Sequence, residues 1–198
     1  MQPIVKELVF ATHNPNKLAE VNSMLPPGFS LCSLESIGCT EAIPETATTL
    51  EGNARLKARY VRDRYGIDCF ADDTGLEVEA LGGAPGVYSA RYAGEGARAA
   101  DNIDRLLREL QGKENRKARF RTVIALAQGD QCLFFEGIVD GQILKQPRGS
   151  EGFGYDPVFL PDGNALSFAE MPLPDKNSIG HRGKAFRALY AYLKELQD

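Results

Sequence analysis

Several features that define common protein classes are missing from this sequence. No apolar run approaches the ~20 residues of a membrane-spanning helix, so we expect no membrane partner. The four cysteines are scattered and form no Cys-x-x-Cys pair, which favours reduced thiols over disulfides or a zinc site. Internal repeats and low-complexity segments are also absent. Together these absences predict a globular, cytoplasmic protein.

An excess of positive charge is missing as well. The chain has 23 Lys+Arg against 27 Asp+Glu, a formal net charge of −4 at pH 7. Because nucleic-acid backbones are polyanionic, this balance predicts no nucleic-acid partner, and an anionic ligand must meet locally concentrated positive charge. With 198 residues and 43% hydrophobic content, the chain suits one globular domain, which we predict to span residues 1–198.

Strand-like and helix-like segments alternate along the chain, which is typical of an α/β fold. The first strand is predicted at Ile4–Val5 and Leu8–Ala11, and Asn14 and Pro15 then suit the N-cap and first residue of a helix. Thr48 and Glu51 have the spacing of a capping box for a second helix. Further predicted elements are strands at 29–34 and 68–71, a hairpin at 118–139 that turns at 129–130, and a final helix that begins around 178–182.

Two segments that follow predicted strands are suited to phosphate chemistry. Thr12–Lys17 lies where a strand gives way to a helix, and free amides at such a junction bind anions. The alternative is an ordinary capped helix with a solvated lysine, and the glycines of a Walker loop are missing. Asp72 and Asp73 offer adjacent carboxylates for Mg²⁺ or for a general base, with Glu45 as a further ligand. Here the alternative is an acidic turn.

Cations elsewhere in the chain are candidates for binding phosphate. Asn53 and Lys57 are four residues apart and therefore share one face of the second predicted helix. Arg91 follows a glycine-rich stretch and can bind phosphate through its planar guanidinium group. A solvated lysine and a purely structural loop are the respective alternatives.

Two later segments are suited to recognising a planar base. Phe153 and Tyr155 lie among glycines beside Asp156, which indicates a stacking surface with an acceptor, or alternatively a bulged strand edge with buried rings. Lys176, His181 and Arg182 gather near the start of the final helix, where the helix dipole disfavours positive charge. That placement favours a ligand-binding role over a solvated surface.

The order and spacing of six segments resemble the inosine triphosphate pyrophosphatase family, the non-canonical purine nucleoside triphosphate pyrophosphatases. The resemblance covers nearly the whole chain. The segments are 12–17, 45–57, 70–76, 81–92, 152–157 and 176–183.

This resemblance implies an α/β fold with an elongated mixed central β-sheet flanked by helices, in two lobes with an active-site cleft between them, and a homodimer. It implies Mg²⁺-dependent hydrolysis of ITP, dITP and XTP to the monophosphate and pyrophosphate, which clears these nucleotides from the pool. It assigns activation of water to Asp73 and metal binding to Glu45, Asp72 and Asp73. With Arg91 added, the predicted substrate contacts are Thr12, His13, Asn14, Pro15, Asn16, Lys17, Asn53, Lys57, Thr74, Arg91, Phe153, Gly154, Tyr155, Asp156, Lys176, His181 and Arg182.

Two positions depart from the family pattern. His13 stands where the family usually has Gly, so we expect it to contact substrate only through its backbone. Thr74 stands where Ser is frequent and keeps the hydroxyl. Selectivity is expected at the purine 6 position, because a 6-amino group leaves the donors that suit a 6-oxo group unpaired, at roughly 1–3 kcal/mol each.

Three other functions compete with this interpretation. A related pyrophosphatase acting on pyrimidine or modified triphosphates would share the metal site and differ in its base contacts. A non-catalytic nucleotide sensor would need no activating carboxylate, so Asp72 and Asp73 argue against it. A single-strand nucleic-acid binder would use the aromatic residues, and the acidic balance argues against that.

Overall fold

A computed structural model describes residues 6–196, so the predicted strand residues Ile4–Val5 lie outside the described part. The chain forms two compact units. The first unit contains the chain up to Asp73, Val123–Glu136, and the chain from Ala185 onward. The second unit contains Thr74–Thr122 and Gly137–Lys184.

The strands form one mixed sheet in the order β2-β1-β3-β5-β6-β7, with β4 paired to β3. β1 runs parallel to β2 and β3, whereas β4 is antiparallel to β3 and β7 to β6. The strands are β1 (Lys6–Phe10), β2 (Phe29–Cys32), β3 (Cys69–Val78), β4 (Pro85–Gly86), β5 (Lys117–Gln128), β6 (Gln131–Ile143) and β7 (Phe159–Pro161).

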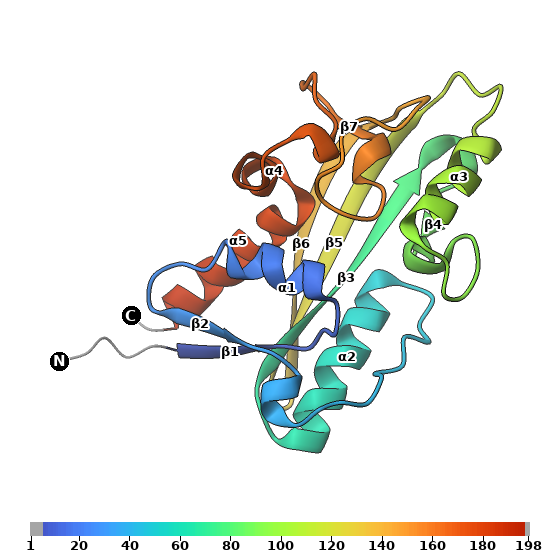
Figure 1. Ribbon diagram of the computed structural model, residues 1–198. Helices are drawn as coiled ribbons and strands as arrows, with labels where there is room; N and C mark the ends of the chain where they lie inside the picture. Colours follow the sequence, from blue (N-terminus) through green and yellow to red (C-terminus); the bar gives the residue numbers. More distant parts are fainter. Residues whose placement is uncertain (1–5, 197–198) are drawn as a thin grey trace. The chain divides into compact units, whose positions relative to one another are not determined.

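Helices accompany this sheet, and the predicted α/β class is confirmed (Figure 1). They are α1 (Pro15–Asn22), α2 (Leu50–Tyr65), α3 (Ala99–Glu109), α4 (Leu173–Ile179) and α5 (His181–Glu195). Within residues 6–196, no helix combines the length and the apolar character needed to cross a membrane.

In the first unit, alternate residues of the strands pack against different helices. Leu8, Phe10 and Phe70 belong to a core cluster with residues of α1 and α5. Val9 and Ala71 belong to a second cluster, with Ala and Val residues of α2. Successive side chains of a strand point to opposite faces, so α1 and α5 cover one face and α2 the other (Figure 1).

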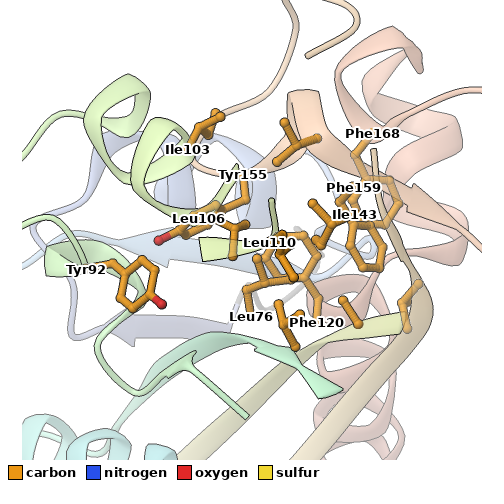
Figure 2. Close-up of a cluster of buried hydrophobic side chains, with 14 of the residues drawn as sticks. Leu76, Tyr92, Ile103, Leu106, Leu110, Phe120, Ile143, Tyr155, Phe159 and Phe168 are labelled. Carbon is orange, nitrogen blue, oxygen red and sulfur yellow. The ribbon is translucent and has the colours of Figure 1, made fainter. Parts of the chain in front are cut away.

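The core of the second unit is built around aromatic rings (Figure 2). Phe120 of β5 lies 4.7 Å from Phe159, and Phe159 lies 5.1 Å from Phe168, between ring centroids. Leu106 of α3 and Leu110, the residue that follows this helix, pack into the same cluster and are almost fully buried. This core holds in place the face of β5 that carries Phe120.

Some predicted elements differ in the structure. The N-cap of α2 is Thr49, whose side chain accepts from the Gly52 amide 3.1 Å away, so the capping box predicted from Thr48 and Glu51 is wrong. β3 continues to Val78 instead of ending at residue 71, since β4 pairs with it beyond that point. The helix α4 was not predicted. The hairpin, which turns at 129–130, and the last helix agree with the sequence prediction.

Candidate active site

Two of the predicted segments meet at one edge of the first unit. β1 pairs with β3 in parallel at Phe10 and Phe70, and the Ala11 amide donates to the Phe70 carbonyl 2.8 Å away. Thr12–Lys17 and Asp72–Asp73 therefore both follow the last parallel pairing of these strands. The carboxyl ends of parallel strands are the usual place for ligands in α/β sheets.

The turn into α1 has the predicted cap. Asn14 Oδ1 accepts from the amides of Asn16 and Lys17 at 3.0 and 3.3 Å, and Thr12 Oγ1 accepts from the Asn14 amide at 3.1 Å. The cap thus engages two of the amides that we predicted to be suited to an anion. The exposed ring of His13 turns toward the loop before α2, with Nε2 2.9 Å from the Glu41 carbonyl oxygen.

Asp72 and Asp73 point to opposite faces of β3 and have different partners. Asp72 Oδ1 lies 2.8 Å from Nζ of Lys17, on the α1 face. Asp73 Oδ2 accepts from Nδ2 of Asn53 at 3.1 Å, on the α2 face. Both carboxylates are buried, at 1% and 8% exposure. Strand alternation thus gives two sequence neighbours two different environments.

Lys57 connects two carboxylates on the α2 face. Its ammonium group makes a short contact with Glu45 Oε1 and lies 3.7 Å from Asp73 Oδ1. Asn53 is oriented on the same face, because its Oδ1 accepts from the Ala47 amide at 2.9 Å and leaves its amide group directed at Asp73. Lys57 and Asn53 thus share a face, as their spacing predicted.

Burial and charge separate the proton affinities of these groups. Burial raises the pKa of Asp73, and the opposing effects of Lys57 and Lys17 do not cancel that rise. Burial also acts to raise the pKa of Glu45, but Lys57 outweighs it and the net pKa is lowered. Burial acts to lower the pKa of Lys57, yet Asp73 and Glu45 raise it overall. Asp73 is therefore the carboxylate of this pair with increased proton affinity, as a general base requires.

The donors on the α2 face fit a hard divalent cation. In the described part of the chain, no group of three or more His, Cys, Asp or Glu is arranged as a metal cluster. However, Mg²⁺ is usually held by one or two carboxylates together with water and substrate phosphates. Glu45 and Asp73 supply two carboxylates around one point, which Lys57 occupies. Asp72 lies on the other face with Lys17, and its predicted role as a ligand stays a prediction.

A second cluster of predicted residues lies in the second unit. Thr74 Oγ1 accepts from Arg182 Nη2 at 3.2 Å and lies 2.7 Å from Oγ1 of Thr122. Thr122 Oγ1 in turn lies 2.6 Å from Nδ1 of His181. The His181 ring stacks on Phe120, with centroids 4.7 Å apart and planes at 23°.

A buried ion pair organises the neighbouring segment. Asp156 Oδ2 accepts from Nζ of Lys176 at 2.7 Å and from the Phe153 amide at 2.8 Å. Lys176 and Arg182 lie over the Phe153 ring, 5.0 and 5.5 Å from its centroid. Gly152 is required here, since its φ is +71° and a Cβ would come within 2.1 Å of Asp156 Oδ2. Asp156 therefore orients the predicted base-binding residues.

Other predicted residues have different surroundings. Tyr155 lies in the hydrophobic core, with its hydroxyl donating to the Ser89 carbonyl at 2.9 Å, so its predicted stacking on a base remains untested (Figure 2). Arg91 lies 3.5 Å from Glu95 Oε1 and over the ring of Tyr88. Neither contact joins Arg91 to the two clusters.

Sequence reasoning missed Thr122 and Phe120. The available signal was a threonine on the inner face of a strongly apolar strand, two residues after a buried phenylalanine. A separate cavity of about 810 Å³ in the second unit contains no predicted site residue. Its lining residues are Asp104, Leu107, Arg108, Leu110, Gln111, Gly112, Lys113, Glu114, Arg116 and Lys145.

Comparison with known proteins identifies the class that this fold and these clusters define. The profile of the Ham1 family matches residues 8–192, so the chain belongs to the Ham1 family and the family resemblance in the sequence is confirmed. A dITP/XTP pyrophosphatase of Flavobacterium psychrophilum is 56% identical over 95% of this chain and 99% of its own length. The corresponding protein of Porphyromonas gingivalis is 55% identical over 96% and 98%. The solved Staphylococcus aureus Ham1 protein is 36% identical, with a TM-score of 0.87 over 96% of this chain and 99% of its own.

Proposed function

We propose that this protein hydrolyses non-canonical purine nucleoside triphosphates, namely dITP, ITP and XTP, to the monophosphate and pyrophosphate. It is a nucleoside triphosphate pyrophosphatase, and its role is to clear these nucleotides from the pool. The observation that carries the proposal is the identity of 55–56%, over nearly the full chain, to proteins named dITP/XTP pyrophosphatase. The paired carboxylates and lysines of the first unit supply the chemistry that this reaction needs.

Asp73 acts as the general base. It accepts a proton from the water that attacks the α-phosphorus, and pyrophosphate leaves with the electrons of the α–β phosphoanhydride bond. Burial favours this role because it raises the pKa of Asp73. Asn53 fixes the orientation of the carboxylate through its bond to Oδ2.

Glu45 and Asp73 would hold Mg²⁺ on the α2 face, and Asp72, which lies on the α1 face with Lys17, is the third candidate ligand. When bound, the ion supplies charge neutralisation and orientation of the triphosphate oxygens. Lys57 and Lys17 bind the triphosphate and neutralise its charge. The capped turn at Thr12–Lys17 positions the triphosphate.

The cluster of the second unit recognises the base. Lys176, His181 and Arg182 donate to base carbonyl groups, and Phe153 provides an aromatic face beneath two of these cations. A 6-amino purine leaves these donors without acceptors, which disfavours ATP relative to XTP or dITP. Base selectivity thus requires that the side-chain nitrogens facing the base carry hydrogen atoms.

Pyrophosphate release from XTP, dITP, ITP, dTTP, UTP and ATP, each with Mg²⁺ and with chelator, tests this function. We expect rapid release from the first three only, abolished by chelator and restored by added Mg²⁺. Equal rates for ATP and ITP would refute the 6-oxo selectivity, and a preference for dTTP or UTP would indicate the pyrimidine-directed alternative. Binding without turnover of any triphosphate would indicate a sensor.

We also propose a homodimer in the cytoplasm. The four free cysteines suit a reducing compartment, and the family resemblance supports the dimer. Light scattering on the eluting peak of a gel-filtration column tests the dimer, since a molar mass near the 21.6 kDa of one chain would refute it.

A further inference from the structure

Thr122 lies at the centre of the hydrogen-bonded cluster in the second unit. It is fully buried and stands two residues after Phe120 on β5, so both side chains point to the same face of the strand. Phe120 stacks on the ring of His181, and Thr122 contacts Nδ1 of that ring at 2.6 Å. Two residues of β5 therefore orient the imidazole ring: Phe120 sets its plane, and Thr122 directs its Nδ1 atom toward the strand.

The direction of hydrogen bonding in this cluster is biased by Arg182, because its guanidinium group can only donate. A guanidinium group has no acceptor, so Arg182 Nη2 donates and Thr74 Oγ1 accepts at 3.2 Å. Accepting a charge-assisted bond strengthens the Thr74 hydroxyl as a donor to Thr122, 2.7 Å away. With Thr74 as the donor, the single proton of Thr122 points to Nδ1 of His181, and the ring proton of neutral His181 is then on Nε2. The reverse direction, in which Nδ1–H donates to Thr122 and Thr122 donates to Thr74, lacks the strengthening that the Arg182 bond gives to the Thr74 hydroxyl as a donor.

We propose that Thr122 is a specificity-determining positioning residue that holds His181 in the Nε2–H tautomer. The hydroxyl chain from Arg182 through Thr74 and Thr122 runs in one direction, and His181 presents a donor at Nε2. A donor pairs with the oxygen of a 6-oxo group and not with a 6-amino group, whose hydrogens are themselves donors. The consequence for substrate choice rests on the function proposed above, whereas the tautomer itself does not.

The tautomer is measured directly on the free protein. The chain has two histidines, so long-range ¹H–¹⁵N spectra of ring-labelled protein at a pH of about 8, where histidine is ordinarily neutral, contain two ring systems. A His13→Gln variant assigns them. We expect His181 to show a protonated Nε2 and an unprotonated Nδ1. A protonated Nδ1 in the wild-type protein would overturn the proposal, and this test does not depend on any Thr122 variant folding.

Two variants separate positioning from packing. Thr122→Val keeps the shape and removes the hydroxyl, and we expect mixed tautomers and a fall of about tenfold in the ratio of kcat/KM for XTP over ATP. Thr122→Ser keeps the hydroxyl and is expected to preserve both. An unchanged ratio in Thr122→Val would overturn the proposal. A wild-type enzyme that does not distinguish XTP from ATP would instead overturn the proposed function and leave the tautomer result standing.

Discussion

Replacing Asp73 with asparagine is expected to change activity and stability in opposite directions. Asparagine keeps the shape of the side chain and can still accept from Asn53 Nδ2, but it cannot accept the proton of a water molecule. We expect kcat/KM for XTP to fall by about 10²–10⁴-fold, the usual contribution of a general base. We also expect the metal-free variant to be more stable than the wild-type protein near neutral pH.

The sign of the stability change follows from the burial of Asp73. Because burial raises its pKa above the ordinary value, the folded protein binds the Asp73 proton more tightly than the unfolded chain does. Stability is therefore lost as the pH rises through the folded-state pKa, and above it the ionised carboxylate imposes its full cost. The raised pKa of Asp73 is a net effect that already includes the attraction of Lys57 and Lys17. Asparagine resembles the protonated form and avoids the cost.

Urea unfolding and thermal melts in chelator, from about pH 5 to pH 8, measure this effect. For a chain of this size, each kcal/mol corresponds to about 2–4 °C in Tm. The gain of Asp73→Asn should be widest at high pH and shrink as the pH falls toward the ordinary range of aspartate. Asp63→Asn is the matched control, because Asp63 is 71% exposed on α2 and should change neither activity nor Tm measurably.

Two results would refute the reasoning separately. Full hydrolysis by Asp73→Asn would show that another group activates the water. A markedly lower Tm at pH 8 would show that the attraction of Lys57, which lies 3.7 Å from the carboxylate, outweighs the cost of burial.

Three further substitutions test the surroundings of the two clusters. Lys57→Met removes the cation that contacts both Glu45 and Asp73 and leaves them the attraction of Lys17. It should lower the free energy of unfolding by about 3 kcal/mol in urea titrations, and a loss below about 1 kcal/mol would contradict the pairing. Gly152→Ala should lower Tm and raise KM for XTP, and Gly163→Ala, the matched control, should change both less. Both glycines have positive φ, but a Cβ clashes only at Gly152. His13→Ala should leave kcat/KM within about threefold, since its ring is exposed and contacts only a loop carbonyl among the described contacts; a larger loss would give the ring a substrate role.

Local patterns in the sequence predicted much of the first unit. Asn14 and Pro15 define the start of α1, and the spacing of Asn53 and Lys57 places them on one face of α2. These features depend on backbone geometry within a few residues, which the sequence specifies directly. The shift of the α2 cap from Thr48 to Thr49 shows the limit, because either threonine suits an N-cap and the chain entering the helix decides between them.

Local sequence patterns could not predict that Asp72 and Asp73 have different partners. The sequence indicated a strand that ended before them, in which case the two carboxylates would be equivalent. The structure continues β3 through both residues, because β4 pairs with it farther along. Pairing between segments distant in sequence therefore decides which carboxylate meets Lys17 and which meets Lys57.

Thr122 was missed for a related reason, and it shows how the two clusters differ physically. The first cluster consists of charges, whose type and spacing are visible in the sequence and whose energies fall slowly with distance. The second depends on the direction of hydrogen bonds along Arg182, Thr74, Thr122 and His181, which requires contacts of 2.6–3.2 Å between segments far apart in the chain. A charge cluster tolerates small displacements, whereas a directional chain fails when one hydroxyl is lost. Loss of the Thr122 hydroxyl should therefore relax base selectivity while the pKa difference between Asp73 and Glu45 persists, so that turnover and selectivity are separable by mutation.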